Sequence, residues 1–178
     1  RTEQPEWDFE GVRAAAKASW NEKLGLIDIE PMDEKQCKIF YTSLYHTMIS
    51  PSVFSDVNGE YRGADGNVYS DEHEQYTIFS LWDTYRTASP LMTIIDGEKA
   101  ASVASTFMNI YNQQGKLPVW HLAGNETNCM IGNPGVIVMA DLILKGFVKD
   151  VPAALEAMKA SSMLDERGQE LLKVYGYI

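Results

Sequence analysis

Residues 34–49, with the sequence EKQCKIFYTSLYHTMI, carry the clearest structural signal in the chain. Apolar side chains recur there at spacings of three and four, the pattern of a helix with one buried face. Asp33 is suited to cap the amino end, Gln36 occupies the capping-box position, and Pro51 follows as a stop. The sequence therefore predicts an amphipathic helix whose apolar stripe comprises Cys37, Phe40, Tyr41, Leu44, Tyr45 and Met48.

The same periodicity recurs on both sides of this helix. It predicts helices over residues 8–23, 77–89, 98–113, 133–146, 152–162 and 165–174. Pro90 is expected to interrupt the second of these and Gly115 to stop the third. Residues 52–75 and 116–132 are polar and rich in turn formers, so we expect long loops there, the first with room for a short hairpin. The pattern predicts an all-α fold of helical hairpins whose longer connections gather at one end to form a site.

Composition limits the kind of protein this can be. With 178 residues, of which 45% are hydrophobic, the chain is sized for one domain with a sizeable core. Its net charge of -10 opposes binding to nucleic acid and to anionic membranes, and no apolar run approaches the length of a membrane span. Residues 1–7 lack a hydrophobic signal core. The two cysteines, Cys37 and Cys129, have no CxxC partner and are expected to be buried thiols.

A polar cluster at residues 120–130, WHLAGNETNCM, is the first candidate for chemistry. Apolar residues flank it, so the carboxyl of Glu126 is expected to be partly enclosed. Enclosure disfavours the charged form of a carboxyl group, which is what a general acid near neutral pH requires. Taken alone, a single loop glutamate is more often a solvated or hydrogen-bonded residue. Asn125 also begins a glycosylation sequon, but glycosylation is a weak interpretation for a residue in an enclosed loop.

Residues 79–86, FSLWDTYR, form the second candidate. A planar side chain such as Trp82 can cover the apolar face of a sugar ring, while Asp83 and Arg86 can bond its hydroxyl groups. The alternative is ordinary structure, with Trp82 in the core and Asp83 paired with Arg86 one helical turn later.

The third candidate is 54–66, FSDVNGEYRGADG, which is rich in the oxygen ligands that calcium prefers. It fails the EF-hand pattern in both possible registers, so a loop that shapes a pocket is the better interpretation. The histidines, His46, His73 and His121, share no metal-binding spacing and are expected to be core or surface residues.

The three segments together, in this order and at these intervals, resemble glycoside hydrolase family 92. The segments WDFEGVRAAAKASWNEKLGLIDIE and KIFYTSLYHTMISPSVFSD resemble the same family, so the likeness covers essentially the whole chain. The resemblance implies a calcium-dependent exo-α-mannosidase, bacterial and exported, that acts with inversion on mannose-containing glycans. It also implies a fold that pairs an N-terminal β-sandwich with an (α/α)6 barrel.

The resemblance assigns roles to individual residues. Glu126, in the motif Gly124-Asn125-Glu126-Thr127, is implied to be the general acid, and the general base to lie beyond Ile178. Substrate-binding positions are implied for Trp82, Asp83, Arg86, Asn125, Thr127, Asp56 and Arg62, while the metal ligands stay unassigned. Family members commonly continue the last motif with Tyr-His-Ala, where this chain has Asn133-Pro134-Gly135, so the contribution of that histidine is missing.

On this basis residues 1–178 are expected to be part of the barrel, with the β-sandwich and the rest of the barrel outside them. The expected partner is a mannose-containing glycan, without nucleic acid or membrane, and exposed barrel faces favour self-association. A periplasmic, extracellular or cell-surface location is implied. The alternatives are a non-catalytic carbohydrate-binding or structural helical fragment that lacks the general base, and a helical scaffold for protein partners.

Overall fold

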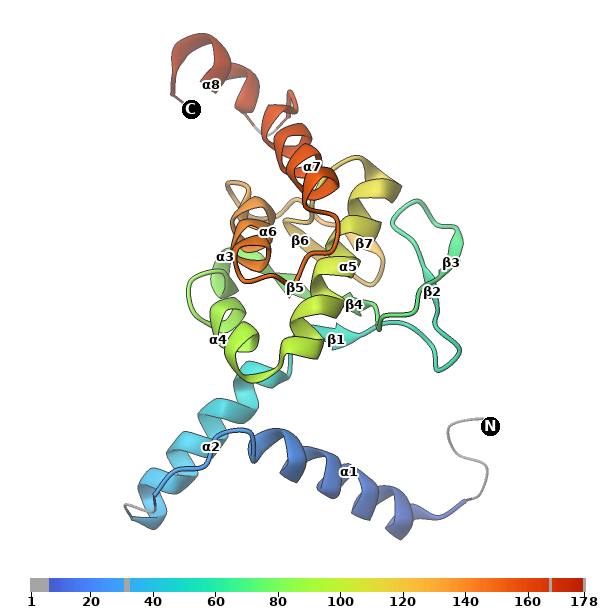
Figure 1. The fold of residues 1–178 in the computed structure, drawn as a ribbon, viewed down its shortest axis with the longest axis vertical. Helices are drawn as coiled ribbons and strands as arrows, with labels where there is room; N and C mark the ends of the chain where they lie inside the picture. The colour runs from blue at the N-terminus through green and yellow to red at the C-terminus, as the bar shows by residue number, and fades with distance from the viewer. Residues whose placement is uncertain (1–6, 31–32, 167, 178) are drawn as a thin grey trace. The chain divides into compact units, whose positions relative to one another are not determined.

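The computed structural model describes residues 7–30, 33–166 and 168–177 of the chain. They divide into two compact units, Arg1–Ser50 and Pro51–Ile178. Figure 1 labels the helices and strands of both units.

The first unit is a pair of helices, α1 (Phe9–Leu24) and α2 (Glu34–Met48), which confirms both predicted helices. Asp8 and Asp33 cap them by accepting the N–H groups of Gly11 and Gln36. Trp20 packs edge-on against Tyr45, with 4.6 Å between ring centroids. No residue of α1 is buried, so its apolar stripe stays open to solvent within the described structure.

The described part of the second unit contains seven short strands, so the prediction of an all-α fold is wrong in this respect. The strands β1 (Ser52–Val53) and β4 (Tyr76–Thr77) pair, as do β2 (Glu60–Arg62) and β3 (Val68–Ser70). A third sheet has the order β5 (Phe79–Ser80), β6 (Trp120–Leu122) and β7 (Asn125–Glu126), all antiparallel. The expected loops at 52–75 and 116–132 are therefore organised as hairpins.

The helix predicted over 77–89 is absent in that form. Its first residues belong to β4 and β5, a short helix α3 (Leu81–Thr84) follows, and α4 (Ala88–Ile95) begins before Pro90. The proline does not interrupt α4 because it lies in the first turn, where a backbone N–H has no partner inside the helix.

The remaining helices correspond to predicted ones, although α8 begins four residues later than the predicted start at Asp165. They are α5 (Gly97–Gln114), α6 (Pro134–Leu144), α7 (Val151–Met163) and α8 (Gln169–Tyr175). Asp96 and Asp150 cap α5 and α7, and Gly115 ends α5 in a left-handed conformation. Asn133 precedes α6 as expected but bonds the carbonyl of Ser161 instead of capping the helix.

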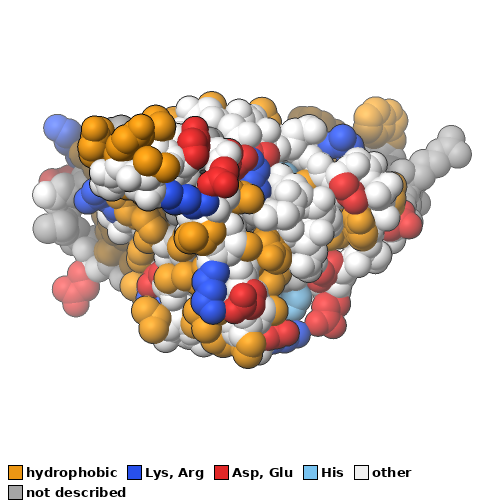
Figure 2. Space-filling view, turned by 90° about the horizontal axis from the view of Figure 1, so that it is seen from above, with side chains coloured by type: hydrophobic (Ala, Val, Ile, Leu, Met, Phe, Trp, Pro, Cys, Tyr) orange, Lys and Arg blue, Asp and Glu red, His pale blue; other side chains and the backbone are white. Residues whose placement is uncertain are grey.

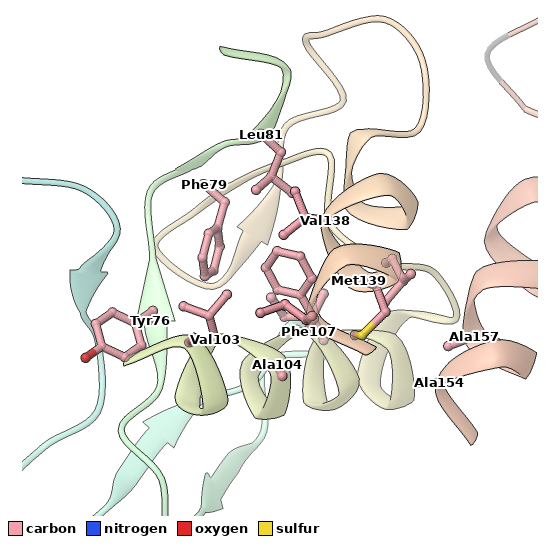
Figure 3. Close-up of a cluster of buried hydrophobic side chains, with 14 residues drawn as sticks. Tyr76, Phe79, Leu81, Val103, Ala104, Phe107, Val138, Met139, Ala154 and Ala157 are labelled. Carbon is pink, nitrogen blue, oxygen red and sulfur yellow. The ribbon is translucent and has the colours of Figure 1, made fainter. Parts of the chain in front are cut away.

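The core of the second unit lies where α5 packs against α6, α7 and β5. Phe107 of α5 is fully buried and meets Phe79 edge-on, with ring centroids 5.0 Å apart. In Figure 3 the side chains of Phe79, Val138 and Met139 gather around this helix. Ala154 and Ala157 present small side chains that let α7 approach closely. This core gives α5 and the β5–β6–β7 sheet a rigid base.

Hydrophobic side chains also reach the surface, interspersed with acidic and basic ones in Figure 2. Cys129 is exposed and Cys37 is half-buried, so the expectation of two buried thiols is wrong for Cys129, which lies in an open loop. None of the described helices is both long and apolar enough to cross a membrane.

Candidate active site

The predicted general acid lies in a tight hairpin between β6 and β7. Ala123 and Gly124 form its two-residue turn and both have positive φ, 48° and 76°, as a type I′ turn requires. Positive φ is unusual for alanine, and a hydrogen bond of 2.7 Å from its N–H to Oγ1 of Thr77 holds it there. The turn is thus anchored to β4.

The carboxylate of Glu126 accepts three backbone hydrogen bonds. Its donors are the N–H groups of Val119 (2.7 Å), Trp120 (3.0 Å) and Asn128 (2.9 Å). Asn128 adopts a positive φ of 52°. The side chain is half-buried, as the flanking apolar residues predicted. All three partners are donors, so the arrangement suits the ionised form of the carboxyl.

Arg62 of β2 reaches this turn from the third predicted segment, residues 54–66. Its Nη1 atom donates to the carbonyl of Gly124 at 3.3 Å and to Oδ1 of Asn125 at 3.5 Å. A Cβ atom at Gly124 would lie 2.8 Å from the same Nη1 atom. The glycine therefore allows both the turn and the close approach of the guanidinium.

The hairpin that carries Arg62 is fixed to α5 by one glutamine. Gln113 accepts the N–H of Ala64 at 2.9 Å and donates to the hydroxyl of Tyr61 at 3.0 Å. Burial raises the pKa of Tyr61, which keeps its hydroxyl neutral. No local pattern predicts this contact, because the partners are about fifty residues apart.

A second polar group fixes the end of the same loop. The Asp71 carboxylate accepts from Asn109 Nδ2 at 2.7 Å and from Ser105 Oγ at 3.2 Å, both on α5. Burial acts to raise the pKa of Asp71, but these bonds and the N–H of His73 outweigh it, and the pKa is lowered. The loop 54–75 is thus bonded to α5 near both ends of its hairpin.

His121 lies within this group as a buried residue, one of the two kinds of position predicted for it. Only 3% of it is exposed, and neither ring nitrogen has a hydrogen-bond partner among the described residues. Burial lowers its pKa; the nearby Glu126 charge opposes this and the Arg62 charge adds to it. His121 is directly opposite Glu126 in the β6–β7 register.

The second predicted segment lies at the edge of the same sheet. Ser80, directly opposite Trp120 in the β5–β6 register, precedes α3, which carries Trp82 and Asp83. Trp82 is 47% exposed, so the alternative that it belongs to the core is wrong.

The charged residues of this segment have other partners than expected. Asp83 accepts the hydroxyl of Ser80, and Arg86 donates to the hydroxyl of Tyr85 at 2.8 Å while its guanidinium covers that ring. The Asp83–Arg86 ion pair that the spacing allows is not found in the described structure, because each side chain bonds a nearer hydroxyl.

Two more predicted residues have local partners. Thr127 donates through its hydroxyl to the carbonyl of Trp120 at 2.8 Å, so it closes the β6–β7 hairpin. Asp56 is exposed in the turn before β2, where its carbonyl accepts the N–H of Gly59 at 2.9 Å. Thr127 thus adjoins Glu126, whereas among the residues that the structure describes no hydrogen bond or ion pair joins Asp56 to Glu126.

Calcium takes six to eight oxygen ligands, usually with several carboxylates among them. Within residues 7–30, 33–166 and 168–177, no three His, Cys, Asp or Glu side chains gather as a metal site would require. The donor set of the described residues therefore does not by itself fit a calcium ion.

Comparison with known proteins identifies the class to which this fold and site belong. Residues 1–178 match the family model described as the glycosyl hydrolase family 92 catalytic domain. The chain therefore belongs to glycosyl hydrolase family 92.

Two solved structures of this family, both from Bacteroides thetaiotaomicron, resemble the chain strongly. One is an α-mannosidase with 36% identity and a TM-score of 0.91 over 97% of this chain, also solved in complex with mannoimidazole. The other is an inverting mannosidase with 31% identity and a TM-score of 0.89 over 98% of this chain. The chain spans 24% and 25% of those two proteins.

A curated fungal relative is more distant. An uncharacterized secreted glycosidase of Arthroderma benhamiae is 34% identical over 82 residues, which is 45% of this chain and 10% of that protein. All these relatives are thus much longer than the chain.

Proposed function

We propose that this chain supplies the acid-bearing part of an exo-α-mannosidase that removes terminal α-linked mannose, of the α-1,2 type, from glycans. The observation that carries the proposal is the half-buried Glu126 carboxyl, held by backbone N–H groups at a turn covered by Arg62. The two Bacteroides relatives, an α-mannosidase and an inverting mannosidase, support the substrate class.

The proposed reaction is hydrolysis with inversion. Glu126 protonates the departing glycosidic oxygen while a second carboxylate activates water on the opposite face of the sugar, the two carboxyl groups standing about 6.5–9.5 Å apart. One carboxyl group does not serve in both roles, so the base comes from another residue, which we leave unassigned. The solved inverting relative supports this stereochemistry.

The geometry around Glu126 suits the state that follows proton donation. Once the proton has left, the carboxylate is bound by the N–H groups of Val119, Trp120 and Asn128. Preformed donors aimed at a charge that develops during the reaction lower its energy without reorganisation. We infer that the turn stabilises the deprotonated Glu126 carboxylate in this way.

Polar and aromatic side chains around the turn are proposed to bind the sugar. Trp82 offers an exposed planar face for the apolar side of a pyranose. Arg62 and Asn125 already touch each other at the turn and have further hydrogen-bonding capacity for hydroxyl groups. Asp83, Arg86, Thr127 and Asp56 are proposed as further contacts to the sugar.

We propose that the full-length protein has the length of its relatives, with this chain as part of an (α/α)6 barrel. The mainly helical second unit supports this placement. The secreted fungal relative supports an extracellular, cell-surface or periplasmic location. Calcium dependence stays a prediction for the full-length protein, and no step above uses the ion.

The three backbone bonds also favour a second candidate function. A carboxylate that closes a loop can be purely structural, in which case the chain is a carbohydrate-binding or structural module and Glu126 has no proton to give. The module binds a mannoside without releasing mannose. A helical scaffold for protein partners binds no sugar at all.

The test is Glu126→Gln in the full-length protein, with the exposed Glu156→Gln on α7 as control. Loss of general acid catalysis lowers the hydrolysis of an α-linked mannose disaccharide about 10²–10⁴-fold. A mannoside with a strongly acidic phenol as leaving group needs no proton, so its hydrolysis persists and shows that the variant is folded. Unchanged turnover of the disaccharide removes the assignment, and equal loss on both substrates favours the structural role.

A further inference from the structure

His121 is a buried polar residue whose ring nitrogens do not contribute a hydrogen bond to the described fold. It is 3% exposed, and both of its ring nitrogens are unpaired among the described residues. Burying a polar group without a partner is costly, and such exceptions in folded proteins call for an explanation. An aromatic ring without nitrogen atoms would fill the same space without that cost.

The neighbour that could use those nitrogens is Glu126. The two residues are directly opposite each other in the antiparallel β6–β7 pair. Side chains at such positions project from the same face of the sheet, with Cβ atoms about 4.5–5.5 Å apart. The Glu126 charge acts on the imidazole, as does that of Arg62 on β2. These are the charged groups that act on His121 within the described structure.

The partners of Glu126 satisfy only one of its two protonation states. An ionised carboxylate is an acceptor, and its three recorded partners are backbone N–H donors. A protonated carboxyl carries an O–H group, which needs an acceptor that no N–H donor can supply. The acid form of Glu126 therefore lacks a partner in this set of contacts.

A neutral imidazole supplies the missing acceptor. It has one N–H group and one nitrogen with a free lone pair. Burial, opposed by Glu126 and aided by Arg62, lowers the pKa of His121, so the ring is neutral at pH 7. Both features that make His121 costly to the fold, its burial and its unpaired nitrogens, thus make it a suitable acceptor.

We propose that His121 is a positioning residue for the acid form of Glu126, accepting the carboxyl O–H through its unprotonated ring nitrogen. No proton is transferred in this contact. The hydrogen bond orients the carboxyl group of Glu126 and stabilises its protonated form, which is the form that reacts. The inference rests on the proposed function, since it gives Glu126 a proton to hold.

The test is the pH dependence of kcat/KM for an α-linked mannose disaccharide in the full-length protein. Activity falls on the alkaline side as the acid loses its proton. His121→Phe keeps a ring but removes the acceptor, so the alkaline limb moves to lower pH by about one unit. KM changes little, and the thermal midpoint stays equal or rises because the unpaired nitrogens are gone.

Conservative variants separate this role from simple packing. The amide oxygens of His121→Asn and His121→Gln lie near the positions of Nδ1 and Nε2, and one of the two variants returns the limb toward its original pH. His73→Asn, a histidine outside the site, leaves the limb in place. An unmoved limb in His121→Phe overturns the inference, as does a moved limb that neither amide variant restores.

Two outcomes keep this inference apart from the proposed function. If Glu126→Gln hydrolyses the disaccharide normally, the proposed function itself fails, whatever His121 does. If Glu126→Gln is inactive but His121→Phe does not move the limb, only the role of His121 fails. In the double variant, His121→Phe adds no further loss, because it acts through Glu126; a multiplied loss contradicts the proposal.

Discussion

The guanidinium of Arg62 and the carbonyl of Gly124 are 3.3 Å apart, although the two residues are separated by 62 positions in the sequence. This contact joins the β2–β3 hairpin to the turn that carries Glu126. It also explains why a glycine follows Ala123, since a side chain there would displace the arginine. The site thus depends on two hairpins that contact each other although they belong to different sheets.

Gly124→Ala is expected to destabilise the protein more than backbone strain alone accounts for. The residue has a φ of 76°, and a Cβ atom would lie 2.8 Å from Nη1 of Arg62. Gly132→Ala is the matched control, because its φ is 71° and no atom lies within 4 Å of its Cβ position. We expect about 1–2 kcal/mol from the backbone in both variants and roughly 1–3 kcal/mol more in Gly124→Ala. Urea unfolding measures both; equal losses would contradict the steric argument.

Gln113→Ala is expected to loosen the hairpin that carries Arg62. The change leaves the N–H of Ala64 and the hydroxyl of Tyr61 without their partner. Each unpaired group costs about 1–3 kcal/mol where it is buried. Hydrogen exchange at the Ala64 amide should accelerate, whereas Asn112→Ala, at the exposed neighbouring position, should leave it unchanged. Equal exchange in both variants would show that Gln113 does not hold the hairpin.

Stability is expected to fall on mild acidification because of His121. Its pKa in the folded chain is lowered from the ordinary value of 6.5, chiefly by burial, while the unfolded chain keeps that value. The unfolded state therefore binds more protons below pH 6.5, and the stability present above that pH is lost as the pH falls toward the folded pKa.

The slope reaches at most about 1.4 kcal/mol per pH unit for this one group. Denaturant unfolding at pH 7 and pH 5.5 measures it. His121→Phe should reduce the loss between these two values. A loss of the same size in both proteins would assign the effect to other groups.

The sequence predicted those parts of the fold that local signals specify. Helices with an aspartate cap and a regular apolar stripe, such as α2 and α5, were predicted to within one or two residues. Residues 76–84 were not, because a short mixed segment fits helix and strand equally by periodicity. Strand pairing determines the structure of this segment. Phe79 of β5 is paired with His121 of β6, 42 positions later, and no local signal indicates this pairing.

The candidate site divides in the same way. Glu126 could be named as a candidate from its polar segment with apolar flanks, whereas a role for Arg62 was implied only by the resemblance to glycoside hydrolase family 92. Their mutual arrangement could not be predicted, because it follows from tertiary contacts such as the clamp of Gln113 on Tyr61. His121 could be predicted only as a core or surface histidine. The structure alone shows that it is buried and that neither ring nitrogen has a hydrogen-bond partner among the described residues.

Chelation tests the predicted calcium requirement of the full-length protein. Calcium usually takes several carboxylates among its oxygen ligands, and no three His, Cys, Asp or Glu side chains gather among the described residues, so its ligands are expected to come partly from elsewhere in that protein. Excess EDTA should abolish hydrolysis of the disaccharide, and added calcium should restore it. Magnesium should restore it poorly, because it demands a smaller octahedral site. Full activity in EDTA, with calcium below the detection limit, would contradict the requirement.

The 178-residue chain is expected to self-associate when expressed alone. Apolar side chains are exposed on α8, where Val174 is 72% and Tyr175 is 63% exposed. Exposed apolar side chains that gather into one surface drive association in water. Light scattering should show a mass that rises with protein concentration, and Val174→Lys should reduce it by placing a charge on that face. Gln169→Lys adds the same charge at the start of the helix and should have less effect. A monomer at all concentrations would mean that the exposed side chains do not form a cohesive face.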